Sequence, residues 1–401
     1  MPWHGVRRQT QLLNALRQII AVTSIGLRAI PQRLGPSLVV VVGMACVVAV
    51  TLSILSLATG FMRTIDDAGR ADRAMVLSRD ARYEYASSIT RDNVPVIADA
   101  PGIRRTVDGK AIISAETLTS IPVTKKSDGL DAYLDLRGIG PEGFALHPEI
   151  RLISGRKFRP AMHELIVGKS ARTAFEGLEV GSSIQMPEGD WTVTGVFESG
   201  GNASESELLA DSEMVLSSLR ATTFKSMTVL LTDAAAFDRF KTALTTNPTL
   251  TVDVVRETDY LALQAQGLNR FLTVVAYLIG GIMGLGALFA ALNTLYSAVS
   301  TRSIEIATLR VFGFGAGAIL TSVLAEALLL SLLGAAIGAS LAWLAFNGNL
   351  HSAGSLVFRL TVTPALMGEG IAAACLLGML GGFLPALRAA RVPEAVALRD
   401  A

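Results

Sequence analysis

The chain has 401 residues, of which 51% are hydrophobic and 17% are charged, and its formal net charge is +1. A soluble protein of this length has fewer apolar and more charged residues. The mean hydropathy of +0.47 therefore favours a membrane protein over a soluble enzyme with buried helices. A basic patch with interleaved aromatic residues would indicate nucleic-acid binding, and the sequence contains none.

The first 36 residues are predicted to be cytoplasmic and to contain an amphipathic, basic helix. The stretch Gln11–Ile25 places apolar side chains on one helical face and basic or polar ones elsewhere. This pattern is typical of a helix that lies on a membrane surface, although a plain solvated helix is the alternative. The apolar face comprises Leu12, Leu16, Ile19 and Ile20.

Four nearly uncharged runs follow, and a helix needs about 20 apolar residues to cross a bilayer. The runs are Ser37–Thr59, Phe271–Val299, Ala316–Phe346 and Ile371–Leu384. The first run is too long, and begins too far into the chain, for a cleaved signal peptide. We therefore predict four retained spans, at residues 37–60, 271–299, 316–346 and 370–386.

Arginine residues indicate how these spans are oriented. They gather in the first 36 residues, in the loop 300–315 and in the tail 387–401. Because basic segments stay in the cytoplasm, both termini and this loop are predicted to be inside. Residues 61–270 and a short loop at 347–369 are then outside. The only cysteines, Cys46 and Cys375, fall within spans, so the outer domain is expected to have no disulfide.

The outer domain has the pattern of a mixed α/β fold. A strand at Ser226–Leu231, a helix at Ala234–Thr245 and a strand at Leu250–Arg256 read as a βαβ unit. A weaker copy is expected at Ala81–Ser114, with its helix at Asn93–Ala98.

A β-rich stretch is expected between the two copies. Its clearest feature is a hairpin of Ser183–Met186 and Trp191–Phe197 around the turn Pro187–Asp190. Two further segments, Asp259–Arg270 and Phe61–Ala71, are expected to continue the second and first spans outward as a helical stalk. Neither junction has a Gly/Ser-rich hinge, which favours a rigid link.

Small residues repeat at helical spacing within the spans. Such pairs let helix backbones approach closely in lipid, although glycine is also common in membrane helices generally. We predict helix-packing faces at these positions. The glycine pairs are Gly280 and Gly284, Gly334 and Gly338, and Gly378 and Gly382, with a weaker repeat at Ala45 and Ala49.

Nucleotide binding is poorly supported. Gly168, Lys169 and Ser170 resemble the end of a phosphate loop, but His163 stands where that loop needs its first glycine. The segment is also predicted to lie outside, away from ATP. We therefore interpret Leu165–Val167 as a strand that ends in a turn.

Metal and hydrolase chemistry are also poorly supported. No two histidines have ligand spacing, and neither G-x-S-x-G nor H-E-x-x-H is present. The clear acidic residue within a span is Glu326, a functional candidate for which we favour a structural or coupling role over a proton relay. The histidines are His4, His147, His163 and His351, and His147 and His163 are expected at the surface.

The loop Thr301–Gly315 is the most suggestive short segment. Arg302 and Glu305 can pair on a helix, and Gly313 can end it so that the chain re-enters the membrane. Such a helix is well placed to contact a cytoplasmic partner. The alternative is an ordinary loop whose arginines only fix the topology.

This region resembles the motif of the FtsX/MacB-type permeases of ABC transporters, which include MacB-like and LolC/E-like members. The matching residues are Arg302, Glu305, Ile306, Leu309, Arg310, Gly313 and then Glu326. The tail is similar as well, at Pro385, Ala386, Ala389, Ala390, Arg391, Pro393, Glu394, Ala395, Leu398 and Arg399. The layout of one span, a large outer domain and three spans also resembles that family.

The resemblance implies a membrane protein with four transmembrane helices and a MacB-like periplasmic core domain in a bacterial inner membrane. It implies a non-catalytic permease subunit that couples ATP hydrolysis by a separate cytoplasmic ABC ATPase to outer-domain motion, for export or for extrusion of lipoproteins, lipids or small molecules. The segment 302–313 would contact the ATPase.

The resemblance also implies partners besides the ATPase. These are membrane lipid and a second permease copy, identical or not, while a periplasmic adaptor and an outer-membrane factor remain open. No cofactor is expected on this chain, because ATP and Mg belong to the ATPase. The alternatives are a regulatory scaffold that activates a periplasmic enzyme, as FtsX-like members do, and a receptor.

Overall fold

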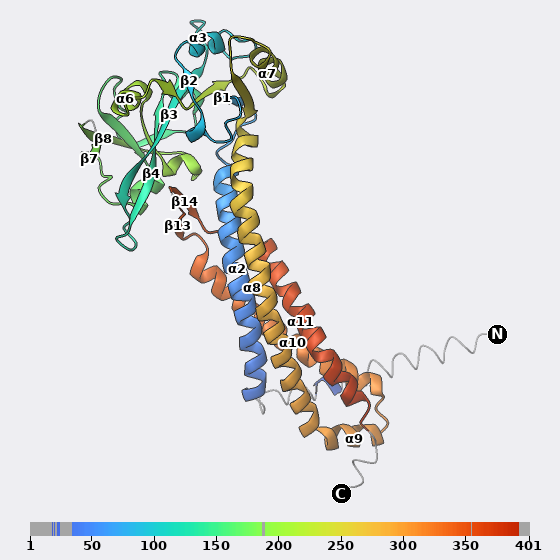
Figure 1. Cartoon of the computed structure of the whole chain (residues 1–401). Helices are drawn as coiled ribbons and strands as arrows, with labels where there is room; N and C mark the ends of the chain where they lie inside the picture. The colour runs from blue at the N-terminus through green and yellow to red at the C-terminus, as the bar shows by residue number, and fades with distance from the viewer. Residues whose placement is uncertain are drawn as a thin grey trace, which may run out of the picture. The chain divides into compact units, whose positions relative to one another are not determined.

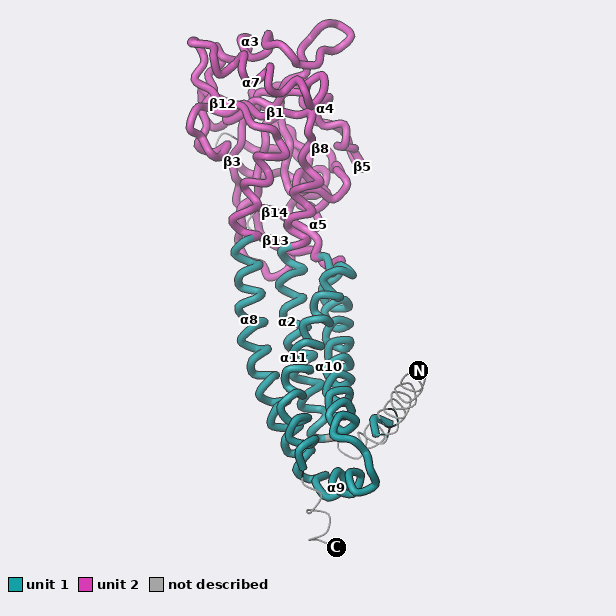
Figure 2. The backbone as a smooth tube through the Cα atoms, turned by 90° about the vertical axis from the view of Figure 1, so that its right-hand side faces the viewer, with its two compact units in different colours: residues 1–58, 270–347, 361–401 teal, residues 59–269, 348–360 magenta. Residues whose placement is uncertain are grey.

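The computed structural model describes residues 18, 20, 22–24, 34–186, 189–353 and 355–392. The chain forms two compact units (Figure 2). Unit 1 comprises residues 1–58, 270–347 and 361–401, and unit 2 comprises residues 59–269 and 348–360. Most of the predicted surface helix Gln11–Ile25, and the tail beyond Val392, lie outside the described residues.

Unit 1 contains long helices that lie side by side in both views (Figures 1 and 2). Four of the described helices are long and apolar enough to cross a membrane, namely α2, α8, α10 and α11. A buried apolar cluster between them includes Met44, Leu52 and Leu330. The helices are α2 (Leu34–Asp66), α8 (Glu257–Thr301), α9 (Ser303–Val311), α10 (Ala316–Phe346) and α11 (Pro364–Ala390).

Some helices begin or end at other residues than the predicted spans and stalk segments do. Helix α11 begins before residue 370 because the Thr363 side chain accepts a hydrogen bond from the Leu366 amide, and Pro364 suits the first turn. Helix α8 runs unbroken through the predicted stalk segment Asp259–Arg270. Helix α2 ends at Asp66, short of the predicted Ala71.

Unit 2 is built on one large mixed sheet with the strand order β12-β1-β11-β3-β4-β9-β6-β8-β5, and β7 pairs with β8. Short helices accompany it, and a separate small sheet pairs β10 with β2. The strands are β1 (Arg73–Ser78), β2 (Ile89–Thr90), β3 (Ile113–Thr124), β4 (Asp131–Ile139), β5 (Arg151–Gly155), β6 (Glu164–Gly168), β7 (Ser183–Met186), β8 (Gly189–Glu198), β9 (Leu208–Asp211), β10 (Thr223–Phe224), β11 (Ser226–Leu230) and β12 (Val252–Arg256). The helices are η2 (Glu84–Ala86), α3 (Asn93–Ala98), α4 (Gly143–Leu146), α5 (Lys169–Ala174), η3 (Ala203–Ser206), α6 (Ser212–Ser218), η4 (Ala234–Ala236) and α7 (Phe237–Thr245).

The first lobe of unit 2 contains the predicted βαβ unit as β11, α7 and β12. Strand β1 lies between β11 and β12 and is antiparallel to both, so those two strands run parallel in a split βαβ arrangement. Helix α7 buries Phe237, Phe240 and Leu244, which are spaced for one helical face.

The predicted weaker copy at Ala81–Ser114 is not a βαβ unit. Helix α3 has the predicted bounds, Asn93–Ala98. However, β2 before it pairs with β10 in the small sheet, whereas β3 after it belongs to the large sheet. A two-residue strand leaves too little alternation for its partner to be predicted from the sequence.

The second lobe is β-rich, as predicted, and packs around Trp191 and Phe175. Strands β7 and β8 form the predicted hairpin, with Met186 opposite Gly189, while residues 187 and 188 lie outside the described part. The turn predicted after β6 is wrong, because helix α5 begins directly after Gly168.

The loop predicted at 347–369 is not simply a loop. It contains the antiparallel strands β13 (Leu350–Ala353) and β14 (Leu356–Arg359). The resulting hairpin belongs to unit 2 rather than to the helix bundle. Unit 2 thus includes residues from the connection between α10 and α11.

Candidate functional site

The segment predicted to contact a cytoplasmic partner folds as the short helix α9 (Figure 1). Gly313 beyond its end has φ +90°. The amides of Gly313 and Phe314 donate to the carbonyls of Arg310, at 2.9 Å, and Leu309, at 3.1 Å. These two bonds form a Schellman motif, which ends a helix and favours glycine at this position. Gly313 therefore allows the chain to turn from α9 into α10.

Arg302, the N-cap residue of α9, connects this helix to α10. Its guanidinium lies 3.3 Å from Glu305 Oε2 and 3.5 Å from Glu326 Oε2. Glu326 is 8% exposed, and an unpaired buried carboxylate would be costly. The pairing explains how α10 accommodates Glu326, and it favours a positioning role for this residue over a proton relay.

Arg310 holds the other end of α9. Its Nη1 atom donates to the carbonyl oxygens of Ala390, at 3.1 Å, and Val392, at 2.9 Å. These carbonyls lie at the C-terminal end of α11, where helix carbonyls lack intrahelical partners and attract cations. Between the two arginines, Ile306 packs in an apolar cluster with Ile319. Helix α9 is thus attached to both α10 and α11.

The exposed side chains of α9 are largely not those that the sequence motif singled out. Among the predicted coupling side chains, only that of Glu305 is exposed, since Arg302, Ile306, Leu309 and Arg310 are buried or half-buried. The exposed apolar residues are Ile304 at 49%, Val311 at 56% and Phe312 at 77%. They occupy variable positions of the motif, but an aromatic residue just before a helix-ending glycine is a signal that could have found Phe312.

A cavity of about 390 Å³ adjoins this helix within unit 1. Its lining is mostly apolar and comes from α8, α9, α10 and Val22 near the N-terminus, with Phe312 and Ile304 among the contributors. A pocket beside exposed apolar side chains is typical of a surface that receives a partner's side chain.

The glycines predicted to form packing faces lie at close contacts between helices. A Cβ atom added at Gly334 would lie 2.5 Å from the Val41 carbonyl oxygen, and one at Gly338 would lie 2.4 Å from that of Ala45. Both distances are shorter than a Cβ atom allows, so α10 meets α2 backbone to backbone. A Cβ atom added at each of the other four glycines would also meet a neighbouring helix: at Gly378 it would lie 2.1 Å from Ser331 Oγ, at Gly382 2.6 Å from Ala327 Cβ, at Gly280 2.5 Å from Thr51 Oγ1 and at Gly284 3.2 Å from Leu377 Cδ1.

We expect Gly334→Leu to destabilise the helix bundle, because a side chain there must push α10 away from the α2 backbone. Overpacking of this kind costs about 1–3 kcal/mol or more. The thermal unfolding midpoint of the full chain should fall clearly. Gly286→Leu is the matched control, since nothing lies within 4 Å of a Cβ atom at Gly286. Equal midpoints for the two variants would contradict the packing role.

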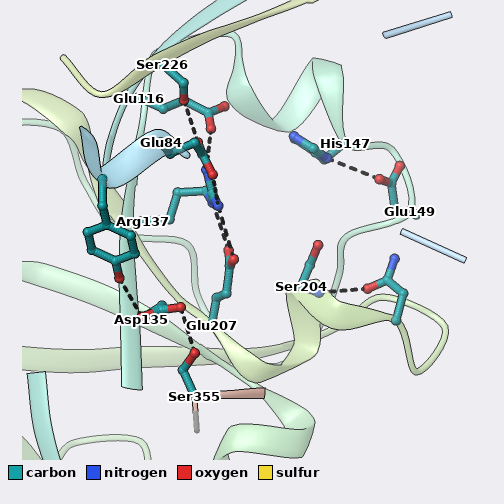
Figure 3. A network of polar contacts seen from close by, with 12 residues as sticks. Glu84, Glu116, Asp135, Arg137, His147, Glu149, Ser204, Glu207, Ser226 and Ser355 are labelled. Carbon is teal, nitrogen blue, oxygen red and sulfur yellow. Dashed lines mark hydrogen bonds and ion pairs between the residues drawn. The ribbon is translucent and has the colours of Figure 1, made fainter. Parts of the chain in front are cut away.

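Unit 2 contains a buried polar network centred on Arg137 of β4 (Figure 3). Its guanidinium lies 2.8 Å from Glu84, 2.9 Å from Glu116 and 2.9 Å from Glu207. Burial raises the pKa of the Glu207 carboxyl above its ordinary value. Burial also opposes ionisation of Glu84, but Arg137 and Ser226 outweigh it and hold that pKa below the ordinary value. One cation therefore faces three acids from separate elements.

A second buried arginine, Arg73 of β1, lies where the long helices enter unit 2. It is 2.7 Å from Glu257, the first residue of α8, and donates at 3.0 Å to the carbonyl of Ala68, just after α2. It also pairs with Glu149 at 2.8 Å and contacts His147. The prediction that His147 is a surface residue is wrong, because its side chain is only 14% exposed. Arg73 contacts residues that are far from it in the chain, so no local sequence pattern predicts this cluster.

The stability of unit 2 should fall in acid because of Glu149. Burial opposes its ionisation, but a hydrogen bond with His147 and the charge of Arg73 lower its pKa to about 2. A lowered carboxyl pKa stabilises the fold above the ordinary value of about 4.5, and that contribution is lost as the pH falls toward 2. We expect a loss of at most about 2 kcal/mol, given partial exposure. Urea unfolding followed by Trp191 fluorescence, with Trp3 and Trp343 replaced by phenylalanine so that Trp191 is the single tryptophan, should show this slope, and Glu149→Gln should flatten it. An unchanged slope in that variant would contradict the assignment.

The hairpin β13–β14 is fixed to the β-rich lobe and to the outer end of α2, all within unit 2. Ser206 Oγ donates to the Val357 carbonyl at 2.9 Å and accepts from its amide at 2.8 Å. The rings of Phe61 and Phe358 meet edge to face, with centroids 5.7 Å apart. A Cβ atom at Gly60 would lie 2.2 Å from the Arg359 carbonyl oxygen. The hairpin thus requires glycine at this turn of α2.

The segment that resembles a phosphate loop makes internal contacts instead. The Lys169 ammonium lies 3.1 Å from Glu198, and Ser170 Oγ donates to Glu205 at 3.1 Å. A Cβ atom at Gly168 would lie 2.1 Å from the Glu205 carbonyl oxygen, so close backbone packing accounts for this glycine. Within the described residues, no group of three or more His, Cys, Asp or Glu side chains could hold a metal ion.

Models of two protein families match successive parts of this chain. The MacB-like periplasmic core domain matches residues 37–247. The FtsX-like permease C-terminal domain matches residues 277–393, which include α9 and its anchors. The chain therefore belongs to the FtsX/MacB family of ABC transporter permeases. It is a membrane protein with an extracytoplasmic domain of the MacB type.

The sequence identity between this chain and individual relatives is low. The chain is 27% identical over 143 residues to an uncharacterised ABC transporter permease, YknZ, from Bacillus subtilis strain 168, an alignment that covers 34% of each protein. It thus spans about a third of the length of that relative. A crystal structure of the extracellular domain of a YknZ transporter from Gram-positive bacteria is also similar, with 15% identity and a TM-score of 0.35. That match covers 46% of this chain and 99% of the other.

Proposed function

We propose that this chain is the non-catalytic membrane subunit of an ABC-type complex, and that it transmits the motion of a separate cytoplasmic ATPase to its own extracytoplasmic domain for export or extrusion. The observation that carries this proposal is helix α9. It is tied to α10 through Arg302 and Glu326 and to α11 through Arg310, yet it exposes Ile304 and Phe312. A helix anchored in this way moves its neighbours when a partner displaces it.

The chain connectivity supports transmission to unit 2. Helices α2 and α8 are each continuous and contribute residues to both units. Their outer ends meet Arg73, through Ala68 and Glu257. A third connection is the hairpin between α10 and α11, which Ser206 fixes to the β-rich lobe. Displacement of the helices would thus reach the sheet at three places.

We also propose where each part of the chain lies in the cell and which proteins it assembles with. Both termini and α9 lie in the cytoplasm of a bacterial cell, and unit 2 lies across the inner membrane in the periplasm, as the distribution of arginine indicates. The functional complex contains a second permease copy and two ATPase subunits. ATP and Mg bind to the ATPase, and this chain holds no cofactor. An adaptor and an outer-membrane factor would extend the path of an exported substrate.

Reconstitution tests this function. The full chain in lipid nanodiscs should bind its ABC ATPase and change the rate of ATP hydrolysis, because coupling is reciprocal between linked sites. An ATPase that neither binds the chain nor changes its rate would contradict the proposal.

A further inference from the structure

A cleft of about 590 Å³ lies between the two lobes of unit 2. One wall comes from the core of the first lobe, with Ile113 and the ring of Phe224. The opposite wall comes from a separate apolar cluster that includes Phe144 and Phe158. A concave site of this volume, lined mainly by apolar and aromatic groups, is typical of a pocket for a small molecule.

Most charged groups at this cleft already have partners. Arg91 of the first lobe and Glu213 of α6 form a two-point ion pair across it, at 2.8 Å and 2.5 Å. Both oxygens of Asp211 accept backbone amides, from Ala161 and from Glu213, each at 2.9 Å. None of these groups needs a ligand to satisfy it.

Lys157 differs from the other charged groups. Its ammonium lies 3.9 Å from the centroid of the Phe144 ring and has no carboxylate partner within the described part of the chain. A lysine over an aromatic ring at the edge of an apolar pocket can bind an anion with its remaining N–H donors. The cleft therefore offers an apolar interior with one available positive charge.

We propose that this cleft is a binding site for a small amphiphile that carries an apolar body and a single anionic group. The apolar body lies between the Phe158 and Phe224 rings, and Lys157 binds the anionic group. The Arg91–Glu213 pair lies beside the site, and a ligand there contacts both of the apolar clusters that line it. The assignment goes beyond the proposed function and does not depend on an ATPase.

Photolabelling of the full chain in lipid nanodiscs tests the site. The probe is palmitate with a diazirine in its chain, and the comparison probe is the methyl ester of the same molecule, which lacks the charge. Mass spectrometry of the digested protein locates the adducts. We expect the acid to label peptides that contain Phe144, Phe158 or Phe224, at about ten times the yield of the ester, because charge-assisted hydrogen bonds are worth about 1.5–3 kcal/mol.

Three variants test the roles of the Lys157 charge and of the cleft volume. Lys157→Gln should lower acid labelling of these peptides about tenfold and leave ester labelling unchanged. Lys110→Gln, at an exposed lysine that does not line the cleft, should change neither. Ala115→Phe partly fills the cleft and should lower labelling by both probes.

Two results would overturn the proposal. One is acid labelling that is confined to the membrane helices. The other is cleft labelling that Lys157→Gln and Lys110→Gln affect equally, which would show that the probe does not sense the charge. Because Lys157 is exposed, its replacement leaves the fold intact, so either result concerns the ligand and not misfolding.

Discussion

Replacing Ile304 and Phe312 together by serine is expected to weaken binding of the ATPase strongly. These side chains are 49% and 77% exposed, and they border the apolar cavity beside α9. Removal of two apolar anchors from the centre of an interface costs several kcal/mol, and each 1.4 kcal/mol is a tenfold loss of affinity. We expect affinity to fall at least about a hundredfold, as measured by ATPase titration of the full chain in nanodiscs.

The control for this experiment is Thr301→Val. Thr301 is exposed at the end of α8, and its hydroxyl donates to the carbonyl of Ala298 on the same helix. Affinity in this variant should stay near the wild-type value. Glu305→Ala should show an intermediate loss, because Glu305 is exposed but sits at the edge of the apolar group. Wild-type affinity in the double serine variant would show that the ATPase docks elsewhere.

Arg137→Met is expected to cause the largest loss of stability in unit 2. Methionine keeps much of the apolar stem but leaves Glu84, Glu116 and Glu207 buried without their common cation. Breaking a buried ion pair by removing one partner costs about 3–5 kcal/mol. The unfolding free energy should be measured at pH 7 by urea titration of the full chain, with Trp191 as the single fluorescent tryptophan after Trp3 and Trp343 are replaced by phenylalanine. Lys126→Met, at an exposed pair with Glu179, should change it by less than about 1 kcal/mol.

The pH dependence distinguishes charge from packing in this variant. Without Arg137, burial should hold the folded-state pKa values of Glu84 and Glu207 above the value of about 4.3 that a glutamate has in an unfolded chain. A raised carboxyl pKa favours the folded state at low pH, and this contribution is lost as the pH increases through it. The deficit of Arg137→Met relative to the wild type should therefore shrink between pH 7 and pH 5. A deficit that is the same at both values would mean that the loss comes from packing alone.

Local sequence patterns were sufficient where one element's own residues decide its structure. The apolar runs predicted the four long helices, because length in a bilayer is a property of each segment alone. The spacing of Phe237, Phe240 and Leu244 predicted α7 and its buried face. The motif around Arg302 and Gly313 predicted both a short helix and its end. The family followed from the same motif.

Contacts between residues that are far apart in the sequence could not be predicted from local patterns. Arg137 gathers carboxylates from three separate elements, and no spacing connects them. The hairpin β13–β14 was expected as a loop because its partner, Ser206, is 151 positions from Val357. In α9 the motif residues proved to be mainly inward-facing anchors, so the predicted set identified the helix but missed Phe312 as its most exposed apolar side chain.

The most direct test of the proposed transmission is a distance measurement across the complex. With Cys46 and Cys375 replaced by alanine, a spin label at exposed Lys110 of each permease copy reports the separation of the outer domains by pulsed electron paramagnetic resonance. We predict that ATP binding by the associated ATPase shifts this distance in the wild type but not in the variant with Ile304→Ser and Phe312→Ser. An unchanged distance in the wild type, with the ATPase bound and active, would contradict transmission through this chain.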